Sequence, residues 1–410
     1  MEIKKEMKKV LLSLALILLP LAVSAAGEIE IDGIYYKLNK KTKTYEVTSN
    51  PNKYAGDIII PSMITYEGVD YNITRIGSDA FKDCSDLTSI TIPSSITYFA
   101  NGSFEGCTNL SLVVFNSNAN IQFNEVFGNQ VEKCILGEGV TSIGERAFSG
   151  CSNLLSIDIP NSVETIKYGA FENCFKLASV IIPNSVKTIE TNAFDGCNGL
   201  TTITIGSGIE NVKDIKYAFH IVHPIKRIII NNNALIANSN DLDSSMSAIF
   251  GEFAEEYILG ENVTSIGDYA FHGCAGMKSV IIPSGVNSIG RYAFQFCRLL
   301  TDIYCYAEQV PEIDGHPFEE GIYSVYSNAT LHVPAGSIDA YKNAEIWKNF
   351  ENIVVLTEGN PKPTRITGVN NNLKNAERYY SLDGKRMVAP HRGLNIIRMS
   401  DGTTKKVILK

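Results

Sequence analysis

The sequence lacks the short patterns that mark most catalytic and cofactor-binding sites. It contains no glycine-rich phosphate loop, no Gly-x-Ser-x-Gly elbow and no His-Glu-x-x-His pair. Its carboxylates stand at variable positions, and no two of them stand out as an acid–base couple. These absences predict a protein that is not an enzyme and that holds no cofactor.

Clusters of positive charge and closely spaced metal ligands are also missing. The formal net charge is −8, and no group of lysine and arginine side chains is dense enough to neutralise phosphates. This argues against nucleic acid as a partner. A zinc site needs two close pairs of ligands. His220 and His223 are near one another, but no carboxylate lies close to them, so we expect no metal site.

One apolar run is long, and it stands at the start of the chain. The run Val10–Val23 follows four lysines and ends in the small residues Ser24, Ala25 and Ala26. It is shorter than the roughly 20 residues that a membrane span needs. We interpret residues 1–26 as a secretory signal peptide, the alternative being an uncleaved anchor. The mature chain is then expected outside the cell, at its surface or in the periplasm, with no integral membrane span.

Self-similarity dominates the rest of the sequence. The motif that contains Phe171, Cys174 and Leu177 returns 23 residues later around Phe194. Most steps between copies are 21 to 25 residues, and one of 31 residues holds a polar insertion near Asn231–Ser247, interpreted as a protruding loop. Two short copies, which begin at Phe127 and Phe250, match each other. The phenylalanines that mark the copies are Phe81, Phe104, Phe127, Phe148, Phe171, Phe194, Phe219, Phe250, Phe271, Phe294 and Phe318.

One copy shows why such a repeat folds by stacking. Val180 and Ile182 alternate with outward residues, as in a short strand, and Pro183 ends the strand because it has no N–H to donate. A single copy cannot bury its apolar residues, whereas stacked copies bury them between neighbours. A fixed period of this length is typical of a solenoid.

The repeat closely resembles the leucine-rich repeats of the BspA-like family, common in secreted proteins of Bacteroidetes, from about Ile58 to Leu356. The resemblance implies a leucine-rich repeat solenoid of about eleven coils. Its parallel strands would form the concave face, and an irregular or short helical arc would form the convex face.

The flanking regions predict a division into further parts. Residues 27–71 are expected to form an N-terminal β cap with a hairpin, 72–334 the solenoid, and 335–357 a helical cap that includes Ser337–Phe350. Residues 358–364 are interpreted as a linker and 365–410 as a small β domain with turns at Asp383-Gly384 and Ser400–Gly402. This last part resembles the sorting domains of the type IX secretion pathway, the alternative being a terminal domain without a sorting role.

Nine cysteines in an exported chain suggest disulfides, but their spacing favours another arrangement. Seven hold one place in the repeat, and Cys134 and Cys305 fall at inward strand positions. We therefore expect free thiols that pack in the core as small apolar groups. Pairing between adjacent coils remains the alternative. The seven are Cys84, Cys107, Cys151, Cys174, Cys197, Cys274 and Cys297.

The outward residue of each strand defines the candidate binding surface. An exposed apolar stripe marks a protein contact. The alternative is that β-branched residues merely suit strands and are partly shielded by their neighbours. The row is Thr91, Val114, Ile135, Asp158, Ile181, Thr204, Ile229, Ile258, Ile281, Tyr304 and His332. Asp158 and Thr204 interrupt it, which favours its later half. The candidate ligand-binding residues are Ile181, Arg227, Ile229, Glu256, Ile258, Ile281, Asp302 and Tyr304.

Three functions compete at this point. The first is a secreted or cell-surface, adhesin-like protein that binds an extracellular protein of host or bacterial origin through the concave face. The second is a polysaccharide-binding accessory protein, which needs an aromatic platform. The third is an enzyme with an unfamiliar site, which would show a pocket with perturbed acid groups. The one cluster of aromatic residues that suits the second function is Tyr304, Tyr306, Tyr323 and Tyr326.

Overall fold

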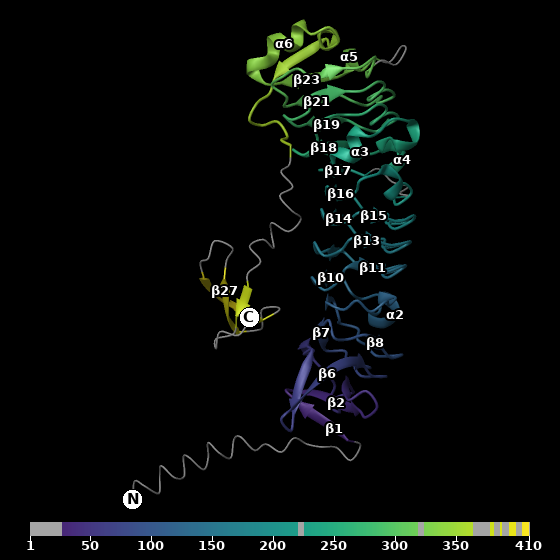
Figure 1. The fold of residues 1–410 in the computed structure, drawn as a ribbon, viewed down its shortest axis with the longest axis vertical. Helices are drawn as coiled ribbons and strands as arrows, with labels where there is room; N and C mark the ends of the chain where they lie inside the picture. Colours follow the sequence, from purple (N-terminus) through teal and green to yellow (C-terminus); the bar gives the residue numbers. More distant parts are fainter. Residues whose placement is uncertain are drawn as a thin grey trace, which may run out of the picture.

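Parallel strands stacked one per repeat form one long side of the molecule (Figure 1). The computed structural model describes residues 27–219, 225–318 and 324–363, together with four strands between 378 and 409. Within these ranges, thirteen of the strands form two sheets of five and eight. The first contains β4 (Gly56–Ile59), β7 (Leu87–Ile92), β9 (Leu112–Phe115), β10 (Lys133–Leu136) and β12 (Ser156–Asp158).

The second sheet continues the same side toward the C-terminal end (Figure 1). It contains β14 (Ser179–Ile182), β16 (Thr202–Ile205), β17 (Arg227–Ile230), β18 (Glu256–Leu259), β19 (Ser279–Ile282), β21 (Asp302–Cys305), β23 (Thr330–Val333) and β24 (Asn352–Val355). The parallel arrangement expected from the repeat is confirmed, and we call the outward surface of both sheets the strand face. Each of the eleven rows read from the sequence has its strand, while β4 and β24 extend the ladder at its ends.

The ladder is interrupted between β12 and β14, which form no strand pair. The amide of Leu155 donates to Glu132 at 2.8 Å, and that of Thr201 donates to Ala178 at 2.9 Å. Between these two contacts, the bond from the Ala178 amide to the Leu155 carbonyl is longer, at 3.4 Å. Ile181 therefore stands on an edge strand within the solenoid.

Two-residue strands line the second side of the coils. In all of them except β8 a polar outward residue precedes an inward isoleucine such as Ile143, Ile166 or Ile189, and they pair in parallel. The strands of this side are β8 (Tyr98–Phe99), β11 (Ser142–Ile143), β13 (Thr165–Ile166), β15 (Thr188–Ile189), β20 (Ser288–Ile289) and β22 (Glu312–Ile313).

A column of phenylalanine rings fills the arc that returns each coil to its strand. Phe171 stacks on Phe148 with ring centroids 5.2 Å apart and on Phe194 at 5.0 Å, with nearly parallel planes. Phe194 continues to Phe219 at 4.8 Å. These spacings match the roughly 4.8 Å between paired strands. One rise per coil therefore allows both ring stacking and strand hydrogen bonding.

The cysteines stand beside this column. All nine are free and buried, which confirms the expectation of core thiols. The Sγ of Cys174 lies 3.2 Å from the Phe148 carbonyl and that of Cys197 lies 3.1 Å from the Phe171 carbonyl, so each thiol donates to the coil before it. Burial raises the pKa of Cys107 and of Cys274 to about 12.

Short helices replace the strand-and-turn pattern in three coils and at the C-terminal end. The insertion at Asn231–Ser247 was expected to protrude, and this is wrong: it forms a helix whose Leu235 and Ile236 are fully buried. Leu235, Ile236 and Met246 pack inward, whereas Leu242 is exposed. The helical segments are α2 (Phe123–Phe127), η1 (Val212–Asp214), α3 (Asn233–Ala237), η2 (Leu242–Ser244), α4 (Met246–Phe250), α5 (Val325–Asn328), η3 (Ala335–Ser337), α6 (Ile338–Asn343) and η4 (Trp347–Asn349).

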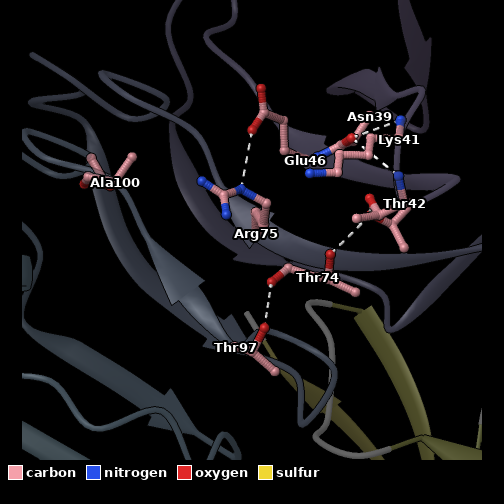
Figure 2. Close-up of polar contacts among 10 residues, drawn as sticks. Asn39, Lys41, Thr42, Glu46, Thr74, Arg75, Thr97 and Ala100 are labelled. Carbon is pink, nitrogen blue, oxygen red and sulfur yellow. Dashed lines mark hydrogen bonds and ion pairs between the residues drawn. The ribbon is translucent and has the colours of Figure 1, made fainter.

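At the N-terminal end the expected hairpin is present as β2 (Ile34–Asn39) and β3 (Thr44–Val47), with β1 (Glu28–Ile31) beside it. β3 pairs with β6 (Val69–Ile76), which pairs with β5 (Met63–Tyr66) and β8, so the hairpin continues the second side. Figure 2 shows the contacts there: Arg75 Nε lies 3.6 Å from Glu46 Oε2, and the Thr97 hydroxyl donates to the Thr74 carbonyl at 3.4 Å.

At the other end α6 and η4 close the last coils. Tyr341 and Trp347 are buried; the Tyr341 hydroxyl donates to the Ala307 carbonyl at 2.9 Å and the Trp347 indole to the Pro311 carbonyl at 3.0 Å. Four further strands, β25 (Arg378–Tyr380), β26 (Arg386–Met387), β27 (Gly393–Arg398) and β28 (Thr404–Leu409), pair antiparallel in the order β26-β25-β27-β28. The turn expected at Asp383-Gly384 lies outside the described residues.

The contribution of the ring column to stability can be tested by removing one ring. Phe171→Ala removes one ring from the stack and leaves a cavity, so we expect the free energy of unfolding to fall by about 3–5 kcal/mol. Urea unfolding followed by circular dichroism measures the change. Phe175→Ala is the matched control, because that ring is 48% exposed, and its effect should stay within about 0.5 kcal/mol. Equal losses in the two variants would contradict the ring column as the core.

The thiols allow a second test. Burial raises the pKa of Cys107, Cys151 and Cys274 to about 12, so these three thiols stay protonated at pH 8, and the thiolate is the reactive form. We expect a maleimide reagent to leave the native protein unmodified and to modify all nine cysteines in guanidinium chloride. Mass spectrometry counts the adducts. Rapid modification of the folded chain would show that the cysteine row is accessible to solvent.

Candidate binding surface

The strand register places the expected outward residues in one row. Ile181 pairs with Thr204, Thr204 with Ile229, and Ile229 with Ile258. The row then passes through Ile281. It continues through Tyr304 to His332. The flanking residues Arg227, Glu256 and Asp302 also stand in register, with Ser279 between the last two.

Exposure along this row differs from the expectation. Ile181 is 46% exposed and Ile229 is half-buried, whereas Ile258 is 6% and Ile281 0% exposed. The expected exposure of Ile258 and Ile281 is therefore wrong. In register, Ile258 lies between Ile229 and Ile281, and Ile281 between Ile258 and Tyr304, so large side chains flank both. Ile181 stands on the edge strand β14 beside the smaller Thr204 and stays accessible.

The charged flank of the later half is engaged in one ion pair and one hydrogen bond. Arg227 Nε contacts Glu256 Oε2, and His332 Nε2 lies 2.9 Å from Asp302 Oδ1. The Tyr304 ring stacks on His332 with centroids 4.4 Å apart. Burial, followed by the charge of Asp302, raises the pKa of Tyr304. Apart from the exposed Arg227, these residues are half-buried, and together they form a polar rim rather than an open apolar stripe.

Two residues outside the expected set make the middle of the solenoid the more accessible apolar region. Leu155 is 45% exposed and Phe175 is 48% exposed, in the two adjacent coils where the strand ladder is interrupted. We call Leu155, Phe175 and Ile181 the mid-solenoid patch. The signal was present in the sequence: most other coils place a polar residue where these two stand, such as Ser152 or Asn198 in place of Phe175 and Thr201 in place of Leu155.

The tyrosines suggested for glycan binding do not form one platform. Tyr326 is 8% exposed and packs edge-on against Phe350. The Tyr306 hydroxyl donates to the Pro361 carbonyl at 2.8 Å, which fastens the segment after β24 to the end of β21. Tyr323 lies outside the described residues. The expectation of a single cluster is wrong for Tyr326 because it belongs to the C-terminal core.

Within the described ranges, no three His, Cys, Asp or Glu side chains are grouped so that they could hold a metal ion. His220 and His223, the pair considered from the sequence, lie outside those ranges. The same part of the chain contains no helix that is long and apolar enough to cross a membrane.

Comparison with known families identifies the repeat. The family model described as the BspA type leucine rich repeat region matches residues 63–130, 128–247 and 247–333, with six copies. The chain belongs to the BspA type leucine-rich repeat family. This confirms the resemblance seen in the sequence. No protein with a curated description matches the chain.

Solved structures with similar folds come from several bacteria. A leucine rich cell surface protein from Faecalibacterium prausnitzii is 21% identical and covers 68% of this BspA type chain and 94% of its own, with a TM-score of 0.29. A leucine-rich repeat protein from Bacteroides ovatus is 21% identical over 80% of this chain and 100% of its own, with a TM-score of 0.28. The pneumococcal vaccine antigen PcpA is 18% identical over 81% and 99%, with a TM-score of 0.33.

The difference between Ile181 and Ile281 can be tested directly. Ile281→Asp places an unpaired charge in a fully buried site, and we expect it to lower the free energy of unfolding by about 3–5 kcal/mol or to prevent folding. Ile181→Asp is the matched variant on the same row and should change stability by no more than about 0.5 kcal/mol. Thermal and urea unfolding of both proteins compare them. A stable Ile281→Asp protein would show that this end of the strand face is open.

Proposed function

We propose that this protein is an exported, extracellular or surface-displayed binding protein that contacts another extracellular protein through the mid-solenoid patch. The observation that carries the proposal is the exposure of Leu155, Phe175 and Ile181, each close to half-exposed, in adjacent coils. Exposed large apolar side chains that gather in one region of a soluble surface favour a protein contact.

The surroundings of the patch support a protein partner. Lys133 Nζ lies 3.6 Å from Asp158 Oδ2, so the strands that precede Ile181 carry both signs of charge. An apolar centre beside polar and charged groups is the usual composition of a protein–protein interface. The Phe175 ring can supply the large buried anchor that dominates such contacts. The candidate residues Arg227, Ile229, Glu256, Asp302 and Tyr304 continue the strand face and would extend the interface toward the C-terminal end.

The proposed location rests on the ends of the chain. Residues 1–26 have the order of a secretory signal peptide, and the C-terminal part resembles a type IX sorting domain. Neither the signal peptide nor the turns of that part lie within the described residues. Membership of the BspA type family and the cell-surface description of one similar structure agree with an exported protein.

A polysaccharide is the second candidate ligand, and one observation favours it. The rings of Tyr269 and Tyr292 are in contact, with centroids 5.2 Å apart and planes tilted by 37°, and both residues adopt left-handed φ values, of 58° and 56°. Bulky residues rarely adopt this conformation. Other coils place Gly169 or Asn192 there, which tolerate it better. Two strained, half-buried rings side by side, with Phe296 at φ 63° nearby in the next turn, form a surface on which a sugar ring could stack.

A binding screen tests the proposal. The chain from residue 27 to residue 410 is assayed by surface plasmon resonance against a panel of extracellular matrix and bacterial surface proteins, and on a glycan array. We expect a protein ligand whose affinity falls at least tenfold, about 1.4 kcal/mol, in the double variant Phe175→Ser, Ile181→Asp. Leu299→Ser is the matched control, because Leu299 is 55% exposed in a distant coil and should leave the affinity unchanged.

The outcomes separate the two ligands. A protein ligand that binds the double variant as tightly as the unaltered chain would overturn the mid-solenoid patch as the interface. A glycan ligand that is lost in Tyr292→Ala but retained in the double variant would replace the protein-binding proposal with the polysaccharide one. Circular dichroism of every variant confirms that the fold is kept.

A further inference from the structure

The coil that follows β9 is shorter on its second side than the others. In an ordinary coil, twelve residues lead from the end of the strand to the stacked phenylalanine, as from Ile182 to Phe194. After β9 this place is reached in eight residues, from Phe115 to Phe123. The Phe123 amide donates to the Ala147 carbonyl at 2.7 Å, as the stacked phenylalanines of other coils do to their neighbours. Among the described residues, no two-residue strand stands between β8 and β11.

A pocket of about 400 Å³ occupies the place of the missing strand. We call it the coil pocket. Its volume and its largely apolar lining are in the range of small-molecule sites. Its apolar wall includes Phe115, Phe123, Leu136, Ile143 and Phe148, and its polar residues are Ser117, Asn118, Asn120, Thr141, Ser142 and Lys167.

The pocket exposes residues whose equivalents in other coils are fully buried. Ala147 is half-buried, whereas the equivalent Ala170 and Ala193 are fully buried. The Gly144 amide, which also lines the pocket, has no hydrogen-bond partner within the described part of the chain. In the next coil, the Lys167 amide at the equivalent place donates to the Ile143 carbonyl at 3.0 Å. The pocket wall thus offers an apolar surface and one unpaired donor.

The coil that follows β17 has the same hydrogen-bond frame but is longer, and it shows what fills this space elsewhere in the same chain. There sixteen residues lead from Ile230 to Met246, whose amide donates to the Ala270 carbonyl at 2.8 Å as that of Phe123 does to Ala147. The added residues form α3. Its Leu235 and Ile236 are fully buried.

The contacts of α3 correspond to the groups that line the pocket. The Gly267 amide, equivalent to that of Gly144, donates to the Ile236 carbonyl at 2.9 Å. The Thr264 amide donates to Asn233 Oδ1 at 2.8 Å, as the Thr141 amide does to Asn118 Oδ1 at 3.1 Å. The backbone around the coil pocket therefore matches that around α3. The pocket has no counterpart of the Leu235 and Ile236 side chains, or of the Ile236 carbonyl that accepts from the glycine amide.

The positive charge among the lining residues indicates which polar group a ligand would carry. Lys167 is the one charged side chain among the residues that line the pocket, in a chain whose net charge is −8. Its ammonium group forms no ion pair with the described residues. A ligand that replaces α3 needs an aliphatic part for the apolar wall and an acceptor for the Gly144 amide, and a negative charge would attract Lys167.

We propose that the coil pocket binds an anionic aliphatic amphiphile, such as a medium-chain carboxylate, with its chain against Phe115, Phe123 and Phe148 and its carboxylate toward Gly144 and Lys167. This site is separate from the mid-solenoid patch, and neither depends on the other.

Isothermal titration calorimetry of the chain from residue 27 to residue 410 with decanoate tests the site, with decanol as the uncharged comparison. We expect saturable, one-to-one binding of decanoate, at least tenfold weaker in Lys167→Ala and abolished in Ala147→Leu, whose side chain fills the pocket. Lys176→Ala is the control, because this exposed lysine lies away from the pocket and its loss should leave the affinity unchanged.

A second variant guards against misfolding of Ala147→Leu. Residues 116–122 are replaced by residues 231–245, which carry α3, and we expect this protein to unfold at a higher temperature and not to bind decanoate. Failure of the unaltered chain to bind decanoate saturably, or equal binding by the unaltered and pocket-filled proteins, overturns the site. Decanol that binds as tightly as decanoate overturns the anionic specificity.

Discussion

Every part of this structure depends on the vertical step between coils. Paired strands and stacked rings both favour a spacing near 4.8 Å, and the phenylalanine centroids lie 4.8 to 5.2 Å apart from Phe148 to Phe219. The thiols of Cys174 and Cys197 donate to the carbonyl of the phenylalanine in the preceding coil, which is a third interaction across the same step. Because the core is a column, the path of a coil can vary as long as it returns one large apolar side chain to that height. Residues 116–123 return Phe123 and residues 231–246 return Met246, each by a path of unusual length.

The repeated features were predictable and the departures from them were not. The period of 23 residues placed Val180, Ile182 and Phe171 inside and Ile181 outside, since each position is read many times over in the sequence. The exposure of Ile281 was not predictable, because it depends on which side chains stand beside it in neighbouring coils. Strands β4 and β24 could not be predicted from the sequence for another reason. Each lies at one end of the ladder, and no second copy of its sequence pattern exists for comparison.

The same reasoning explains where candidate sites were found. Apolar residues recur at core positions because packing requires them there. An apolar residue such as Phe175, at a position that is polar in most other coils, is not explained by core packing. Tyr269 and Tyr292 depart from the repeat in backbone conformation, and the pocket beside Ala147 departs from it in length. None of these is a motif in the usual sense. Each becomes visible when one coil is compared with the others in the same chain.

The interruption between β12 and β14 has a mechanical meaning. Along the strand face no ladder of hydrogen bonds crosses this level, whereas on the second side β11, β13 and β15 remain paired across it. At this level the coils are therefore held together by the second side and by the core, where Phe148 stacks on Phe171, and not by a strand ladder. Because fewer backbone hydrogen bonds resist separation of the strands here, we expect bending of the solenoid to change the spacing between β12 and β14 before that of the paired strands. A partner bound across this level would hold that spacing fixed.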